Sequence, residues 1–140
     1  MTGFFKNNSK KKKNNIINSS KQKIMAQAFQ FHAKGNISEA AKYYQYFISQ
    51  GFHDHRVFSN YGVILRDLGK LNEARSCLKK AIEINPNYPI AYSNLGGILR
   101  DLGKLNEAEL ATRQAIKLNP NNVEAYSNLG GILRDLGKIK

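Results

Sequence analysis

The sequence predicts an all-α protein, an α–α superhelix of about 3.5 antiparallel helical hairpins, because it repeats itself at a fixed period. The phrase that begins at Ser59 returns with few changes at Ser93 and again at Ser127, so successive copies are evenly spaced. Inside each period the apolar residues follow helical spacing. The period is 34 residues, the distance from Ser59 to Ser93 and from Ser93 to Ser127. Such a period is typical of stacked arrays, in which each unit buries its apolar face against its neighbours.

Each full period contains the pattern of two helices. The apolar stripe of the first helix covers Phe58 to Leu68, and that of the second covers Leu71 to Ile82. Gly69 lies between them and can end the first helix in a left-handed cap. The second helix is expected to end before Pro86, because proline disfavours helical geometry in the residue that precedes it. Neither helix can bury its stripe alone, so neighbouring hairpins are expected to stack.

Taken in order, the chain divides into an arm and four repeat segments. Residues 1–20 are rich in lysine, asparagine and serine and poor in apolar side chains, so we expect a disordered basic N-terminal arm. Residues 21–54 form a degenerate first repeat, and residues 55–88 and 89–122 form the second and third. Residues 123–140 supply only the first helix of a truncated fourth repeat.

Composition argues for a cytoplasmic protein without a transmembrane segment. The one cysteine, Cys77, cannot form a disulfide within the chain and fits a reducing compartment. No apolar run approaches the roughly 20 residues that span a bilayer. The formal charge of +12 is concentrated in residues 1–23, which hold seven lysines and no acid. We interpret the run Lys10–Lys13 as part of a solubilising tail, in preference to a contact for nucleic acid or an anionic membrane.

The order of aromatic, small and apolar residues within the period resembles the tetratricopeptide repeat. The residues that carry the resemblance are Tyr92, Leu95-Gly96, Leu99, Ala108, Ala115 and Pro120. The match is full over 55–88 and 89–122 and weak over 21–54. It is similar in particular to the repeats of O-linked N-acetylglucosamine transferases and of bacterial tetratricopeptide proteins. Two departures are tyrosine or phenylalanine in place of the usual tryptophan, and Thr112 where a large aromatic residue is common.

The resemblance implies that the first helices line a concave groove. Gly97 and Gly131 follow family glycines in mid-helix, where glycine costs about 1 kcal/mol against alanine. We interpret them as an open helix surface on which an extended peptide lies close to asparagine amides, which both donate and accept hydrogen bonds. Arg66, Arg100 and Arg134 occupy equivalent positions of successive repeats and form an arginine row, and the aspartate after each of them forms an aspartate row. The arginine row either binds carboxylates or phosphates or pairs with the aspartate row. The candidate groove residues are Asn60, Asn94, Asn128, Ser93, Ser127, Gly97, Gly131, Arg66, Arg100, Arg134 and Asp101, with Met25 and Phe29 at an apolar end.

The last segment stops where a second helix should begin. Its apolar stripe consists of Tyr126, Leu129, Leu133 and Leu136. Part of this stripe should pack on the preceding repeat, and the rest has no partner within the chain. We therefore expect self-association, as a homodimer or a larger homo-oligomer, through these residues.

The leading functional hypothesis is a non-catalytic protein–protein interaction module, a scaffold that binds an extended peptide of a protein partner. One alternative is a self-associating structural array, and another is the N-terminal substrate-recognition arm of a larger, glycosyltransferase-like enzyme. No catalytic residue, cofactor or metal is expected, because no phosphate-binding glycine loop and no nucleophile with an identifiable base are present. His53-Asp54-His55 has no further metal ligand nearby in the sequence, so we interpret it as a solvated loop.

Overall fold

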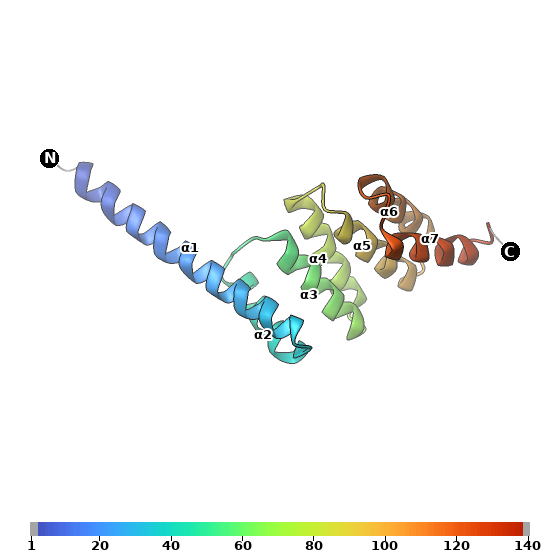
Figure 1. Ribbon diagram of the computed structural model, residues 1–140, viewed down its shortest axis with the longest axis horizontal. Helices are drawn as coiled ribbons and strands as arrows, with labels where there is room; N and C mark the ends of the chain where they lie inside the picture. Colours follow the sequence, from blue (N-terminus) through green and yellow to red (C-terminus); the bar gives the residue numbers. More distant parts are fainter. Residues whose placement is uncertain (1–2, 139–140) are drawn as a thin grey trace. The chain divides into compact units, whose positions relative to one another are not determined.

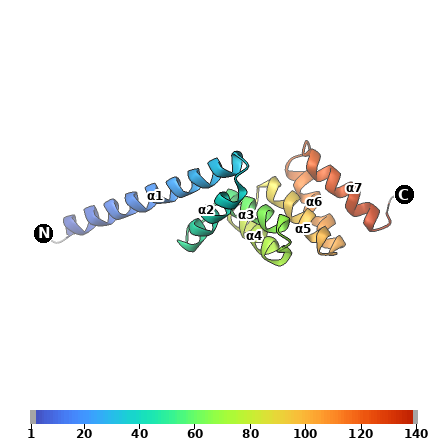
Figure 2. The same cartoon turned by 90° about the horizontal axis from the view of Figure 1, so that it is seen from below.

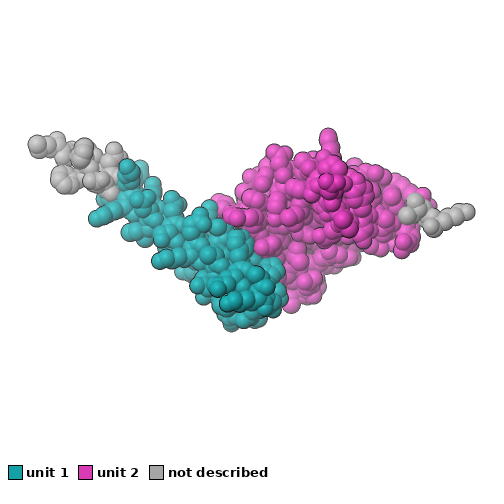
Figure 3. Space-filling model, viewed as in Figure 1, with its two compact units in different colours: residues 1–52 teal, residues 53–140 magenta. Residues whose placement is uncertain are grey.

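A computed structural model describes residues 3–138 and divides the chain into two compact units (Figure 3). Unit 1 comprises Met1–Phe52 and unit 2 comprises His53–Lys140. Within the described residues every regular element is a helix, and no strand is present. The all-α fold that the sequence predicts is confirmed.

The described helices pair as antiparallel hairpins (Figure 1). Unit 1 contains α1 and α2. In unit 2, α3 pairs with α4 and α5 with α6, while α7 packs on α6. The bounds of the helices are α1 (Gly3–Ala33), α2 (Ile37–Ser49), α3 (His55–Asp67), α4 (Leu71–Ile84), α5 (Pro89–Asp101), α6 (Leu105–Leu118) and α7 (Val123–Asp135).

Local sequence signals explain where the helices of unit 2 begin and end. Asp54 precedes α3, and its side-chain Oδ1 accepts a hydrogen bond from the backbone N–H of Arg56 at 2.9 Å, which satisfies one of the free donors of the first turn. Gly69 and Gly103 follow α3 and α5 with φ of 78° and 75°, a left-handed conformation that glycine adopts without strain. The N–H of each accordingly bonds back to the last turn of its helix.

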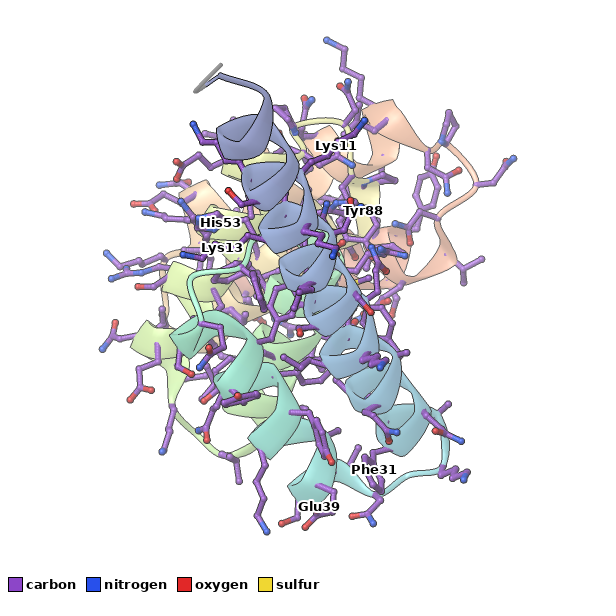
Figure 4. All side chains as sticks on the ribbon, turned by 90° about the vertical axis from the view of Figure 1, so that its left-hand side faces the viewer. Lys11, Lys13, Phe31, Glu39, His53 and Tyr88 are labelled. Carbon is purple, nitrogen blue, oxygen red and sulfur yellow. The ribbon has the colours of Figure 1, made fainter. Side chains whose placement is uncertain are left out.

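Unit 1 is held together by an aromatic contact between α1 and α2. Tyr44 and Phe47 on α2 are fully buried. The Tyr44 hydroxyl lies 2.8 Å from Nδ1 of His32 on α1, so the buried phenol has a hydrogen-bond partner. The ring of Phe31 stacks on that of Tyr43 with centroids 5.4 Å apart. Phe31 and Glu39 lie at the same end of this hairpin (Figure 4).

The N-terminal part of α1 differs from the sequence prediction, because residues 3–20 are helical where a disordered arm is expected. The described side chains between Ser9 and Ser20 are exposed, and Lys11 and Lys13 project from the helix (Figure 4). Two physical facts allow a helix without an apolar face. Lysine is a good helix former, and a helix already nucleated by packing, here near Met25, extends at little further cost.

In unit 2, helices α3 to α7 pack against one another in chain order (Figures 1 and 2). The buried side chains of these helices are mostly small or apolar. Gly62 on α3 lies against Leu78 on α4, and Gly96 on α5 lies against Thr112 on α6, so that each pair of helices approaches closely. Ile98 on α5 and Ile132 on α7 are fully buried. None of the described helices combines the length and apolar character needed to cross a membrane.

Candidate functional site on the first helices of unit 2

Two asparagines on the first helices bind the serine of the preceding first helix. Nδ2 of Asn94 on α5 donates to Oγ of Ser59 on α3 at 3.3 Å. Nδ2 of Asn128 on α7 donates to the backbone oxygen of Ser93 at 3.2 Å and to its Oγ at 3.5 Å. Both contacts join residues 35 positions apart. The repeated sequence therefore makes a repeated contact between successive hairpins.

The arginine and aspartate rows make a second contact with the same separation. Nε of Arg66 donates to Oδ2 of Asp101 at 2.6 Å, and Nε of Arg100 donates to Oδ2 of Asp135 at 2.6 Å. The hydrogen bond from Arg100 lowers the pKa of Asp135 from its usual value, and the same bond raises the pKa of Arg100. Of the two interpretations that the sequence leaves open, the structure shows pairing between the rows. We call this series of pairs the arginine–aspartate ladder.

The mid-helix glycines serve the ladder. A Cβ atom added at Gly97 would lie 2.6 Å from Nη1 and 3.0 Å from Cζ of Arg66, and one added at Gly131 would overlap the guanidinium of Arg100. Both glycines are buried. The interpretation of Gly97 and Gly131 as an open surface for a peptide is therefore wrong, because a guanidinium from the preceding helix covers each of them.

The sequence itself contains a matched exception to this arrangement. One period before Arg66 the chain has His32, and one period before Gly97 it has Val63. His32 thus replaces the arginine of the first period, and the branched side chain of Val63 replaces the glycine of the second period. At this position of the repeat, glycine thus occurs only where an arginine guanidinium of the preceding first helix lies on it.

Several other predicted groove residues are not available to a ligand. Ser93 retains 1% of its exposure and Met25 retains 6%, so neither lines an open surface. The rotation of the helix predicts that Ser93 and Met25 lie on its outer face. The equivalent residue of the second repeat, Ser59, is also buried, because Asn94 on the following first helix covers it. Phe29 is half-buried, with its ring 6.2 Å from that of Tyr44. Asn60, Asn94 and Asn128 remain half-buried and partly reachable from solvent.

The final helix shows what the first-helix surface looks like without a following hairpin. Leu95 and Leu99 on α5 retain 8% and 3% of their exposure, whereas Leu129 and Leu133 at the same positions of α7 are only half-buried. Tyr126 is 50% exposed, and Leu136 is half-buried. Among the residues that the structure describes, none outside the Gly130 helix backbone lies within 4 Å of a Cβ added at Gly130. Ser127 and Arg134 are exposed, and Arg134 forms no salt bridge within residues 3–138.

Sequence reasoning missed a carboxylate that ties the end of α7 to α6. Glu109 accepts from Nζ of Lys138 at 2.8 Å and from Nε of Arg113 at 3.0 Å. These two hydrogen bonds, that of Lys138 first, lower the pKa of Glu109. The pair with Arg113 has the i, i+4 spacing of a helix-surface ion pair and could have been recognised. The pair with Lys138 depends on how α7 folds back and has no signal in the sequence.

Unit 1 has a shallow aromatic hollow that the sequence analysis did not single out. It encloses about 210 Å³ and is lined by Glu39, Lys42, Tyr43 and Tyr46, all on one face of α2. Lys42 and Glu39 form an ion pair at its edge. Spacing of three and four residues along one helix could have identified this face.

The described residues contain no cluster of three or more histidine, cysteine, aspartate or glutamate side chains that could hold a metal ion. Burial, with a contribution from Glu73, raises the pKa of Cys77 to about 11. Its thiol is therefore protonated near neutral pH, and a protonated thiol is a poor nucleophile.

Comparison with known proteins supports the geometric description. The family model of the TPR repeat matches residues 62–99 and 96–137. No curated protein sequence matches the chain. Among solved structures, the first TPR domain of Spaghetti (RPAP3) bound to the Hsp90 peptide SRMEEVD is similar, with a TM-score of 0.76 and 26% identity over 84% of this chain and 93% of that one. The second TPR domain of human RPAP3 in complex with the Hsp70 peptide SGPTIEEVD has a TM-score of 0.71 and 25% identity, with the same coverage. An O-GlcNAc transferase of Thermobaculum terrenum shares the fold, with a TM-score of 0.75 and 17% identity, and this chain covers 22% of its length.

Proposed function

Because the chain belongs to the tetratricopeptide repeat family, we propose that it is a non-catalytic protein–protein interaction module that binds an extended peptide along α3, α5 and α7 of unit 2. The similar RPAP3 domains hold the peptides SRMEEVD and SGPTIEEVD, which supports a peptide as the class of ligand. The residues that we propose to contact it are Asn94 and Asn128.

The observation that carries this proposal is the common orientation of the two asparagines. Each amide directs Nδ2 toward a serine of the preceding helix. A planar amide that is held by its NH2 group presents its Oδ1 in a fixed direction. Both side chains are partly exposed. Two acceptors that recur once per repeat suit the backbone N–H groups of an extended peptide, whose donors also recur at regular intervals.

The arginine–aspartate ladder sets an expectation for the chemistry of the peptide. The charges of Arg66 and Arg100 are compensated by Asp101 and Asp135. We therefore expect the affinity to depend more on contacts with the peptide backbone than on acidic side chains of the peptide. An analogue of SRMEEVD in which amides replace the three acidic side chains should bind nearly as well as SRMEEVD itself.

The test compares two double variants of the full chain. The peptides SRMEEVD and SGPTIEEVD are the first probes, followed by peptides selected from a random displayed library, and binding is measured by fluorescence anisotropy. Removing two hydrogen bonds by Asn94→Ala with Asn128→Ala should cost about 2 kcal/mol, which raises Kd roughly 30-fold.

The matched control is Asn72→Ala with Asn106→Ala. These asparagines are exposed, lie on the second helices α4 and α6, and are also one period apart. The control should leave Kd unchanged. Equal affinity of both double variants for a selected peptide would remove the asparagines from the binding site. Failure to select any peptide that binds would contradict the proposal as a whole.

A further inference from the structure

We propose that the N-terminal part of α1 lies in the major groove of double-stranded DNA and binds the DNA phosphates without reading the base sequence. This surface belongs to unit 1, so the inference is independent of peptide binding along α3, α5 and α7. It rests on the length of α1, on the charge that this helix carries and on the distribution of that charge around the helix.

The helix α1 is much longer than the helix that it packs against. It has 31 residues, whereas α2 has 13. The contact with α2 comes from the C-terminal part of α1, where Met25 and Ala28 are buried and Phe31 stacks on Tyr43. Residues 3–20 extend beyond this packed region (Figures 1 and 2), over about 27 Å at 1.5 Å per residue. The extension is therefore free to contact a partner along its length.

The positive charge of this extension is not balanced by acidic residues. Residues 1–23 hold seven lysines and no acid, and the first acidic residue of the chain is Glu39 on α2. The lysines Lys10–Lys13 are exposed, and none of them forms a salt bridge within residues 3–138. Lys10 and Lys13 are three residues apart on one helix, a spacing at which like charges repel. A polyanion that neutralises them removes this repulsion, so charge complementarity favours an anionic partner.

The lysines surround the helix instead of forming a single stripe. Successive residues of an α-helix are rotated by about 100°, so the four residues of Lys10–Lys13 are spread over the whole circumference. Figure 4 shows Lys11 and Lys13 on different sides of α1. A flat protein or membrane surface contacts only one side of a helix. A helix that binds a membrane surface also needs an apolar face, whereas Ile16 is the only apolar residue among the described side chains from Ser9 to Ser20.

The major groove of DNA accepts a helix with charge on all sides. The groove is about 12 Å wide, which matches the helix diameter of about 10–12 Å, and phosphates line both of its edges. Lysines on opposite sides of α1 can therefore neutralise phosphates of both strands. The major groove of A-form RNA is too deep and narrow for such a contact. Charge and shape together identify a DNA duplex as the partner, and contacts with phosphates carry no sequence information.

The test measures binding of the full chain to fluorescent DNA duplexes of about 20 base pairs by anisotropy, at salt concentrations from about 50 to 200 mM. Two duplexes of unrelated sequence should bind equally well. One neutralised phosphate for each of Lys10–Lys13, Lys21 and Lys23 predicts that the logarithm of the association constant falls with the logarithm of the salt concentration with a slope of about −5. The parent chain should lose affinity about 1,000-fold over this range. Absence of binding at the lowest salt concentration would overturn the proposal.

Two quadruple variants separate α1 from the general positive charge of the chain. Replacing Lys10–Lys13 by glutamine should reduce the slope to about −2 and raise Kd at least about 100-fold at the lowest salt concentration. The matched control replaces four exposed lysines of unit 2 by glutamine and removes the same charge. These lysines are Lys70, Lys79, Lys104 and Lys117. The control should leave Kd and the slope nearly unchanged, and equal losses in both variants would overturn the proposal.

A proline substitution distinguishes a helix in the groove from a flexible basic tail. Asn14→Pro keeps every lysine but interrupts the helix directly after Lys13, and it should raise Kd about 10-fold. The packed part of α1 begins several residues later, so the hairpin with α2 stays intact. Asn14→Ala keeps the helix and should bind like the parent. Equal affinity of these two variants would show that helical structure is not required, and would overturn the proposal.

The remaining anionic partners are tested as competitors of the labelled duplex. An RNA duplex of the same sequence, phosphatidylserine vesicles and polyglutamate are each added at the same concentration of negative charge. Unlabelled DNA should displace the labelled duplex at concentrations at least about 10-fold lower than any of these three. A competitor that displaces the duplex as effectively as unlabelled DNA would identify a different partner and overturn the proposal.

Discussion

The substitutions Gly96→Ala and Gly130→Ala offer the sharpest test of the packing described above, because they make the same change in two helices, α5 and α7, whose sequences differ only at their first two residues. Gly96 and Gly130 are equivalent residues of α5 and α7, one period apart. Their surroundings differ. A Cβ at Gly96 would overlap Oγ1 of Thr112 and lie 3.4 Å from the backbone oxygen of Ala108, whereas a Cβ at Gly130 would meet no other part of residues 3–138 within 4 Å.

The expected magnitudes follow from two opposing effects. Replacing a mid-helix glycine by alanine stabilises the folded state by about 1 kcal/mol at either position. At Gly96 the added methyl group must also displace a fully buried threonine, and overpacking of this kind costs about 1–3 kcal/mol. Gly130→Ala should therefore raise the free energy of unfolding by about 1 kcal/mol, while Gly96→Ala should lower it by up to about 2 kcal/mol.

Urea unfolding followed by far-UV circular dichroism measures both values against the parent chain. Subtracting one from the other cancels the helix-propensity effect, because the neighbouring residues are identical. The remainder, about 1–3 kcal/mol, is the cost of contact with α6. Equal changes in the two variants would refute the assignment of Gly96 to a close helix contact. A destabilising Gly130→Ala would show that another segment lies against α7.

Four further predictions concern single residues. Gly97→Ala should change the free energy of unfolding by less than about 1 kcal/mol in urea titrations, because the gain in helix propensity offsets the loss of the exposed ion pair between Arg66 and Asp101. A decrease in the free energy of unfolding above about 2 kcal/mol would show that the glycine has a packing role. Thr112→Val should stabilise the chain by about 1 kcal/mol, because its buried Oγ1 has no hydrogen-bond partner among the described residues, and a lower Tm would indicate that this hydroxyl is satisfied. Cys77 should react with iodoacetamide at pH 8 far more slowly in the folded chain than in urea, because its pKa is raised to about 11; equal rates would contradict the burial. Asp54→Ala should cost about 1 kcal/mol near neutral pH through loss of the α3 cap. Burial tends to raise the pKa of Asp54, but hydrogen bonds from Arg56 outweigh it and lower the pKa below 3.8, so this contribution is complete above pH 3.8 and disappears as the pH falls through the folded-state value. Parent and variant should thus converge in stability only in strong acid.

The hairpin architecture of unit 2 was predictable because the ends of α3 to α6 have local signals. The prolines and asparagines after α4 and α6, the glycines after α3 and α5, and the spacing of the apolar stripes are all readable from the letters alone. The segment 1–20 was harder to predict, because its lack of apolar side chains suggests disorder while its lysines favour a helix. The prediction weighed burial alone, and the structure shows a helix over the described part of this segment.

The sequence predicted which equivalent residues form rows along the first helices. It predicted less well which of these residues contact one another. Helical geometry assigns a face to each residue, but the tilt of one hairpin on the next decides whether Ser93 is covered or open. A glycine at position 97 destabilises the helix relative to alanine, which made this residue conspicuous in the sequence. The guanidinium of Arg66, on the preceding first helix, lies against it and explains its presence. One period earlier, the sequence has Val63 in place of glycine and His32 in place of arginine. This comparison would have indicated that the glycine occurs together with an arginine one period before it.

The constant sequence separation between paired side chains, 35 positions in each case, has an evolutionary consequence. If recombination removed residues 70–103, Ser59 would face Asn128, Arg66 would face Asp135, and Gly131 would take the place of Gly97, all at the original offsets. Unequal crossing-over between the repeated gene segments can thus shorten or lengthen the protein by whole hairpins without requiring a single compensating substitution.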